Sequence, residues 1–136
     1  MRYSSDVAYY ADGSPYSYLG ADGALNVGWL HAAHGFPTGE SVPALVSNLV
    51  RLCREPVNVK RGWHSCELCQ RHRSATSLGP TVVHDADGDL RVGHAEIRVH
   101  ANDGVTFAAP DMIVHYVLAH RYLPPEAFVE AVVAAA

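Results

Sequence analysis

The sequence has no apolar run approaching the roughly 20 residues that a membrane-spanning helix needs. Its first residues, MRYSSDVAYYADGS, contain no apolar core like that of a secretory signal peptide. We therefore expect a cytoplasmic protein with no membrane span. Internal repeats and low-complexity linkers are absent as well, and a chain of 136 residues fits one domain.

An excess of positive charge is also lacking, because the formal net charge is −4. An acidic balance disfavours broad nonspecific binding of nucleic acid, which needs a positive surface. The basic residues are unevenly spread, however, and four of them flank a pair of cysteines: Lys60, Arg61, Arg71 and Arg73. They form either a small basic patch or ordinary solvated loop charges. Nucleic acid is therefore not the partner that we expect.

Two common catalytic signatures are missing, since the chain has neither a glycine-rich phosphate loop nor a G-x-S-x-G nucleophile elbow. Hydrophobic residues make up 49% of the chain and charged residues 18%, which is typical of a globular protein and argues against disorder. The composition thus predicts a folded domain with a real core, and it identifies no reaction.

Hydrophobic periodicity predicts a first helix over about 42–54, where apolar residues recur at spacings of three and four. Ser41 is the expected N-cap, and Pro43 suits the first turn. Pro56 prevents the helix from continuing. The stretch VNVKRGW that follows alternates in polarity and predicts a short strand leading to the cysteines.

Two turn signals, Asp87-Gly88 and Asp103-Gly104, each separate stretches that alternate between apolar and polar residues. They predict two hairpins in a small antiparallel sheet with one buried face. Near the end of the chain, Asp111 is the expected N-cap of a helix over about 112–122, and Pro125 begins a last helix.

Residues 1–25 have an irregular pattern and are interpreted as an N-terminal arm, followed by one domain over 26–136. At the start of that domain, Val27, Trp29 and Leu30 are the expected buried anchors of an extended stretch. The predicted fold class is α+β, with one N-terminal-side helix, a small antiparallel sheet and two C-terminal helices.

The residues most suited to chemistry lie in 61–72, RGWHSCELCQRH, where Cys66 and Cys69 form a C-x-x-C pair. In a reducing compartment, such a pair indicates metal binding or redox chemistry more than a structural disulfide. The third cysteine, Cys53, lies within a helical pattern and is interpreted as a small buried apolar residue.

Zinc prefers thiolate and imidazole ligands in tetrahedral sets, and a C-x-x-C turn supplies two of them. His115 and His120 are the first candidates for the other two, since H-x4-H is within the histidine spacing of Cys2His2 sites. The separation between the two pairs is far longer than in a DNA-binding zinc finger. Tertiary folding must therefore assemble the site.

Helix geometry leaves the histidine ligands ambiguous, because positions five apart on a regular α-helix differ by about 140°. His115 and His120 converge only if the last turn loosens, which the approaching Pro124 favours. His64 is the alternative, since residues two apart in an extended stretch point the same way and would aim His64 and Cys66 together. We expect zinc to bind four of five residues: His64, Cys66, Cys69, His115 and His120.

Two other interpretations of the cysteine pair stay open. In the first, neighbouring Arg61, His64 and Arg71 lower a thiol pKa and the pair cycles between dithiol and disulfide. The stretch CELCQRHRSATSLGP lacks a convincing apolar helical stripe, which a thioredoxin-like motif should have. In the second, the cysteines are unligated thiols in a loop.

A metal at this site also has two alternative roles. If only three protein residues bound it, the open position would permit catalysis, with Glu67 as a general base. Thiolate-rich sites are more often structural, however, and Glu67 is then an exposed loop carboxylate. Metal binding of the structural kind would stabilise the single domain directly.

Five stretches cover most of the chain after about residue 25: NVGWLHAAHGFPTGE, LCREPVNVKRGWHSCELC, AEIRV, FAAPDMIVHYVLAH and YLPPEAFVEAV. Together they resemble an uncharacterised family of small actinomycete proteins. The resemblance implies a bacterial source, and it groups the five candidate ligands into an HxCxxC knuckle and a C-terminal HYVxxHxYxPP motif. It implies no activity. This sequence departs from the family in residues 70–95, where we expect an inserted hairpin.

The expected function is that of a zinc-stabilised module that binds a protein partner, because the site is expected to be closed and no catalytic set is evident. A metal-dependent hydrolase with an open Cys/Cys/His site is one alternative. Weak binding of nucleic acid or phosphate through the basic residues beside the cysteines is the other.

Overall fold

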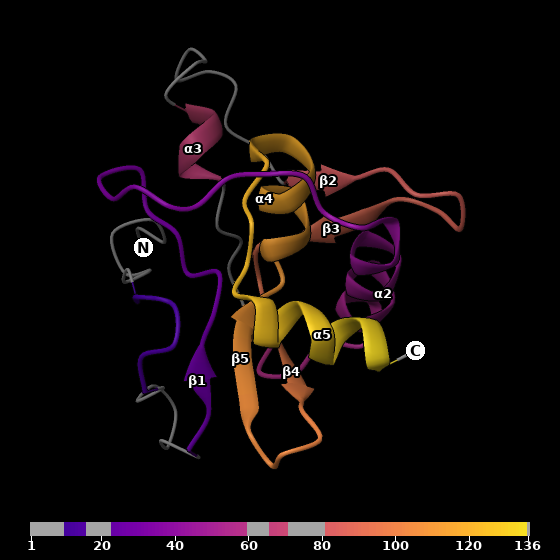
Figure 1. Ribbon diagram of the computed structural model, residues 1–136. Helices are drawn as coiled ribbons and strands as arrows, with labels where there is room; N and C mark the ends of the chain where they lie inside the picture. The colour runs from indigo at the N-terminus through magenta and orange to yellow at the C-terminus, as the bar shows by residue number, and fades with distance from the viewer. Residues whose placement is uncertain (1–9, 16–22, 60–65, 71–80, 136) are drawn as a thin grey trace.

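The structure is a computed structural model that describes residues 10–15, 23–59, 66–70 and 81–135, with the backbone alone at 67 and 70. Helices pack against small sheets, which confirms the predicted α+β class (Figure 1). The elements in chain order are β1 (Leu25–Asn26), α2 (Pro43–Arg54), α3 (Glu67–Gln70), β2 (Thr81–Val83), β3 (Leu90–Val92), β4 (Glu96–His100), β5 (Thr106–Pro110), α4 (Ile113–His120) and α5 (Glu126–Ala134). Among the described residues, no helix has the length and apolar character needed to cross a membrane.

Both predicted hairpins are present, since β2 pairs with β3 and β4 pairs with β5, in each case antiparallel. The strands are divided between two sheets, however. β1 runs parallel to β5 and completes a mixed sheet in the order β1-β5-β4, whereas β2 and β3 form a sheet of their own. A strand of two residues has no readable alternation, and alternation does not say which strands pair. The sequence pattern therefore could not predict this division.

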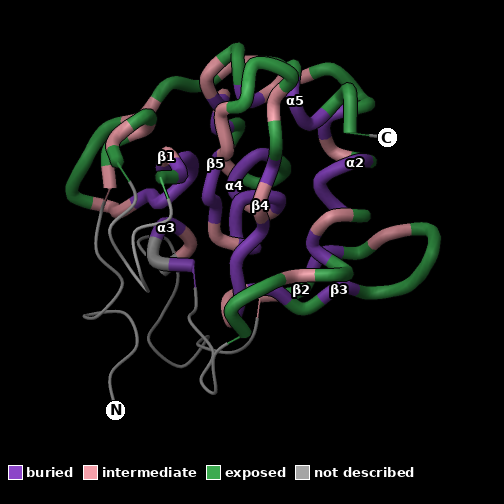
Figure 2. Tube along the Cα trace, turned by 90° about the horizontal axis from the view of Figure 1, so that it is seen from below, coloured by how far each residue is buried: buried purple, intermediate pink, exposed green. Residues whose placement is uncertain are grey.

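The core lies where the helices α2, α4 and α5 meet the strands. Figure 2 shows buried segments of α2, α4 and β5 in the interior, with exposed residues in the loops around them. Phe107 on β5 meets Phe128 on α5 edge to face, with ring centroids 5.6 Å apart. Phe128 is fully buried, and burying a side chain of this size contributes roughly 1.5–3 kcal/mol.

The extended stretch after β1 is buried as predicted. Val27, Trp29 and Leu30 all belong to the buried residues. The indole N–H of Trp29 donates to the carbonyl oxygen of Ala108 at 3.0 Å. This bond continues the attachment that β1 begins and holds the stretch against β5.

The first predicted helix is confirmed as α2, but its expected cap is wrong. Pro43 is the first helical residue, so the cap position falls on Val42, and no side chain caps the helix. Val42 has no side-chain acceptor, and Ser41 lies one residue too early to serve. Pro43 itself lacks an N–H, which leaves one fewer helical donor to satisfy.

The strand predicted for VNVKRGW is wrong in its described part. Val57 forms only an isolated antiparallel bridge with Glu96. Asn58 then adopts a left-handed backbone with a φ of 51°, which ends any extended pairing. The amide of Asn58 donates to the buried Glu96 carboxylate at 3.0 Å, so this turn is anchored by side chains. Residues 60–63 lie outside the described residues.

The prediction of Asp111 as an N-cap is also wrong. Met112 occupies the cap position of α4, and no side chain caps this helix. The Asp111 side chain is buried instead, where it accepts the Gly93 N–H at 2.8 Å and lies 3.2 Å from Nδ1 of His94. Burial at the junction of β5 and α4 turns the carboxylate inward, away from the helix end.

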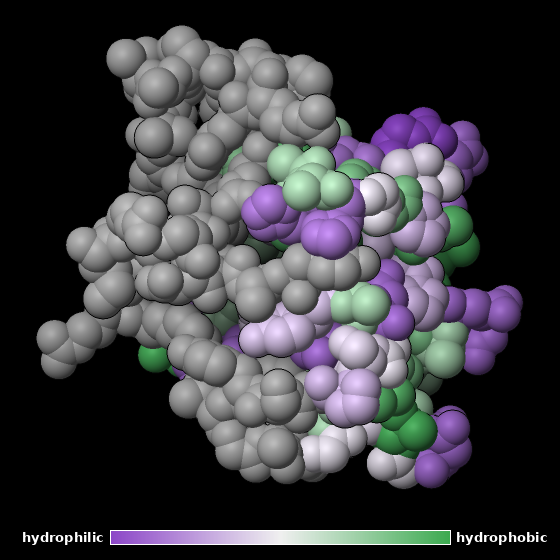
Figure 3. Space-filling model, turned by 90° about the vertical axis from the view of Figure 1, so that its left-hand side faces the viewer, coloured by the Kyte–Doolittle hydropathy of each residue, from purple (hydrophilic) through white to green (hydrophobic). Residues whose placement is uncertain are grey.

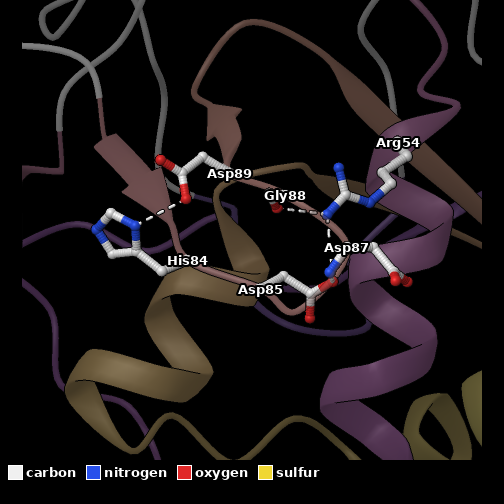
Figure 4. A network of polar contacts seen from close by, with 6 residues as sticks. All are labelled: Arg54, His84, Asp85, Asp87, Gly88 and Asp89. Carbon is white, nitrogen blue, oxygen red and sulfur yellow. Dashed lines mark hydrogen bonds and ion pairs between the residues drawn. The ribbon is translucent and has the colours of Figure 1, made fainter.

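The β2–β3 hairpin is tied to the end of α2 by Arg54 (Figure 4). The guanidinium contacts the Asp85 carboxylate at 3.2 Å and donates to the Gly88 carbonyl oxygen at 2.7 Å. A hydrogen bond from the Asp87 N–H, and then the Arg54 charge, hold the pKa of Asp85 below its ordinary value. The acidic turn is thus held by bonds within the hairpin and to α2.

Residues 10–15 lie beside β1, and Pro15 forms an isolated antiparallel bridge with Leu25. Within the predicted N-terminal arm, residues 1–9 and 16–22 lie outside the described residues. The boundary at residue 25 and the single domain over 26–136 stay predictions.

Gly28 allows a close approach between the stretch after β1 and helix α4. Its φ is +82°, and a Cβ there would lie 2.7 Å from Cδ1 of Ile113. We expect Gly28→Ala to lower the free energy of unfolding by roughly 2–4 kcal/mol, because backbone strain and overpacking add. Gly104→Ala is the matched control, since its φ is +91° and its Cβ meets open space. It should cost only roughly 1–2 kcal/mol. Urea denaturation measures both changes. If Gly28→Ala and Gly104→Ala lose the same free energy of unfolding, the predicted clash with Ile113 is contradicted.

Burial raises the pKa of Asp111, although the Gly93 N–H and the His94 imidazole oppose the shift. A raised folded pKa contributes stability that is present below the unfolded pKa, about 3.9, and is lost as the pH rises through the folded pKa. Asp111→Asn keeps an oxygen for Gly93. As the pH rises from about 4 to neutrality, we therefore expect the free energy of unfolding of Asp111→Asn to increase relative to that of the wild type.

The matched control for this prediction is Asp85→Asn, because the pKa of Asp85 is lowered. A lowered pKa contributes stability that is already present above the unfolded value of about 3.9 and is lost only as the pH falls through the folded pKa. The difference in stability between this variant and the wild type should therefore stay nearly constant from about pH 4 to neutrality. Urea denaturation across the range measures both differences. Since His94 and the Cys53 thiol also face Asp111, the titration is repeated with His94→Gln. A pH-independent difference for Asp111→Asn would refute the argument.

Candidate metal centre

The last turn of α4 is not regular. The backbone N–H of Arg121 bonds to the carbonyl oxygen of Tyr116, five residues back, and the N–H of Tyr122 reaches the same oxygen at 3.2 Å. A bond to the fifth preceding carbonyl marks a π-type turn, which is wider than an α-helical one. Arg121 then takes a left-handed conformation with a φ of 57°, and the helix ends.

This widened turn brings His115 and His120 together. Their ring centroids lie 5.2 Å apart, with the rings at 76° to each other. On a regular helix the two side chains would point about 140° apart. The last turn of α4 is therefore loosened, as the convergence of His115 and His120 requires. Both imidazoles lie on one side of α4 and are half-buried.

The two cysteines lie at the start of α3 and within it, and α3 is a helix of one turn at the same end of the molecule as α4 (Figure 1). Cys66 immediately precedes α3 and Cys69 is its third residue, so the three-residue spacing can place both sulfurs on one side. Leu68 is buried in the core cluster and fixes the turn. Cys66 is buried and Cys69 is half-buried.

The four side chains converge on one point. Nε2 of His120 lies 3.4 Å from Sγ of Cys66 and 3.3 Å from Sγ of Cys69. Nε2 of His115 lies 3.2 Å from Sγ of Cys69. One ligand atom from each of the four residues lies within 4.8 Å of all the others. The paired segments are 46 to 54 residues apart in the chain, so the tertiary fold assembles the cluster.

These separations suit a tetrahedral ion. Metal–sulfur bonds of about 2.3 Å and metal–nitrogen bonds of about 2.0 Å place sulfur and nitrogen about 3.5 Å apart in a tetrahedral zinc site. The three sulfur–nitrogen separations here are slightly shorter. The cluster could therefore hold a metal ion.

The Cys66 thiol has little tendency to ionise. Burial, and then the charge of Cys69, raise the pKa of the Cys66 thiol to about 12, although backbone N–H groups of Cys69 and Leu68 partly offset this. A reactive dithiol needs a lowered thiol pKa. Cys66 is therefore not the activated thiol that such a pair would need, and the redox interpretation stays a prediction. Arg61, His64 and Arg71, which the redox interpretation invoked, lie outside the described residues.

The structure brings together four of the five predicted ligands: Cys66, Cys69, His115 and His120. His64 lies outside the described residues, so its part in the site stays a prediction. The Glu67 side chain is not described either. The third cysteine is buried as predicted, and Sγ of Cys53 donates to the carbonyl oxygen of Asp111 at 3.6 Å.

Comparison with known protein families matches residues 8–133 to a domain of unknown function, DUF7919. The chain belongs to this family. The DUF7919 match spans the five stretches on which the resemblance was based, whereas an actinomycete source stays a prediction. Comparisons of the DUF7919 chain with curated proteins and with solved structures gave no match.

Proposed function

We propose that the DUF7919 domain binds one zinc ion through Cys66, Cys69, His115 and His120, and that this ion is structural. The observation that carries the proposal is the convergence of two sulfur and two nitrogen atoms within 4.8 Å. Two thiolates and two imidazoles in tetrahedral reach suit zinc better than magnesium or calcium, which prefer oxygen ligands.

The proposed ion would act as a cross-link between α3 and α4. A helix of a single turn is not stable alone, because forming its first turn fixes several residues for few hydrogen bonds. Binding to α4 through a shared ion would hold α3 in place. The free energy of metal binding would then contribute directly to folding.

A site with four protein ligands leaves no coordination position for substrate or water, which supports a structural role over hydrolysis. With a fold stabilised in this way, and with no catalytic set evident among the described residues, the domain is best interpreted as an interaction module for a protein partner. The hydrolase alternative requires one of the four residues to leave the ion and Glu67 to face it.

Nucleic-acid binding receives no support from the described residues. The four basic residues on which it depends, Lys60, Arg61, Arg71 and Arg73, lie outside them. On the face in Figure 3, the described residues mix hydrophilic and hydrophobic side chains. The net charge of −4 remains unfavourable for binding phosphates.

Elemental analysis of the purified protein tests the metal directly. We expect one equivalent of zinc in the wild type and its loss in Cys66→Ser, because serine is a poor zinc ligand. Cys53→Ser is the matched control, since Cys53 is also buried but lies outside the cluster, and it should retain zinc. A metal-free wild type, or zinc retained by Cys66→Ser, would contradict the proposal.

Chelation tests the structural role without a mutation. When free zinc exceeds its Kd about a thousandfold, the ion stabilises the fold by about 4 kcal/mol. We therefore expect Tm to fall by at least about 10 °C when a chelator removes the ion. Adding zinc back, and not magnesium, should restore it. A metal-free protein that melts at the same temperature would show that the ion is not structural.

Cobalt substitution separates a closed site from an open one. We expect Co²⁺ to give the intense visible bands of a tetrahedral thiolate site, unchanged by azide, because all four positions are filled. His64→Ala should leave this spectrum and the zinc content intact. A spectrum that responds to azide would favour the hydrolase. Loss of zinc in His64→Ala would show that His64 is one of the zinc ligands.

A further inference from the structure

The chain just beyond His120 is held by one buried tyrosine. Tyr122 is fully buried and packs edge to face against Phe36, with centroids 5.9 Å apart. Its hydroxyl donates to Oδ2 of Asp12 at 2.8 Å. Thr38 forms an isolated bridge with Tyr122, so the backbone is held as well. These contacts hold the chain two residues beyond His120, directly after the widened last turn of α4.

The start of α4 is held at Gly28. Ile113, the first residue of the helix, is fully buried and packs so closely on Gly28 that a Cβ there would clash at 2.7 Å. The backbone N–H of Gly28 donates to Oδ1 of Asp12 at 3.0 Å. The two oxygens of the Asp12 carboxylate therefore accept one hydrogen bond each. One comes from Gly28, which packs on the start of α4, and the other from Tyr122, which lies just beyond its end.

Asp12 is itself held in place through Asn26, which is fully buried. The Gly13 N–H donates to the Asn26 carbonyl oxygen at 2.6 Å, and the Asn26 N–H donates to the Ser14 carbonyl oxygen at 2.8 Å. The Asn26 amide also donates to the carbonyl oxygens of Ser14 and Pro15. Residues 12–15 are thus a fixed support for the carboxylate.

We infer that Asp12 is a positioning residue for His115 and His120, acting through Gly28 and Tyr122. This inference rests on the proposed zinc site. Asp12 is not part of the metal cluster, and its effect is transmitted by α4. Hydrogen bonds to a carboxylate are stronger than those between neutral groups, so the pair of bonds can resist the rotation of the irregular helix end.

The test uses two variants of the full chain and two matched controls. Tyr122→Phe removes one hydroxyl and its bond to Asp12, and Asp12→Ala removes both bonds. Tyr10→Phe makes the same change on a ring that packs on Trp29, and Asp103→Ala removes a carboxylate bond to the Val105 N–H in the β4–β5 turn. Each protein is checked for folding by circular dichroism.

Zinc affinity is measured by competition with a chromophoric chelator. Loss of a residue that orients metal ligands typically weakens metal affinity by about 10- to 100-fold. We expect about tenfold for Tyr122→Phe and a value toward the upper end of that range for Asp12→Ala. The Co²⁺ visible bands should shift in both variants, because His120 moves relative to the ion. Both controls should keep the wild-type affinity and spectrum.

The outcomes separate this inference from the proposal on which it rests. If the wild type binds zinc and Asp12→Ala binds it as tightly, the positioning role is refuted and the zinc site stands. If Asp103→Ala weakens zinc binding equally, or the Co²⁺ bands of Asp12→Ala do not move, only general stability has changed, and the inference is again refuted. If the wild type binds no zinc, the proposed zinc site and the positioning role of Asp12 are both refuted.

Discussion

Two sulfur atoms and two nitrogen atoms face one another between α3 and α4, and the contacts among them join the two helices at this end of the molecule. A buried thiol such as Cys66 has little tendency to ionise alone, since burial raises its pKa. A bound divalent cation would lower that pKa, because it stabilises the thiolate directly, and neutral imidazoles can bind the same cation. The same ion would join α3, which is too short to be stable alone, to a helix that is built into the core.

Helix α4 connects this site to the rest of the fold. Its first residue is packed against Gly28, and the chain beyond its last residue is held by Tyr122. Between these supports the helix is regular until its final turn, where the hydrogen bonds reach five residues back. The irregular turn aligns the two histidines. The contacts at the two ends of the helix come from residues far away in the chain.

Much of the framework follows from local patterns. The apolar spacing of α2 and the Asp-Gly turns of the two hairpins are local properties, and the predicted elements are present. The helix caps failed because they depend on surroundings: Asp111 turns inward to a distant N–H, and Val42 takes the cap position because helix α2 begins at Pro43. The parallel pairing of β1 could not be read from a strand of two residues.

For the site, residue type and spacing determined the chemistry, since a C-x-x-C pair and an H-x4-H pair contain the ligands that zinc prefers. Sequence alone left open whether His115 and His120 could meet, because a regular helix separates them by about 140°. Only the tertiary structure decided that, through the widened turn after Tyr116. Ligand identity is a local property of the chain. Ligand direction depends on packing between segments that the sequence does not place together.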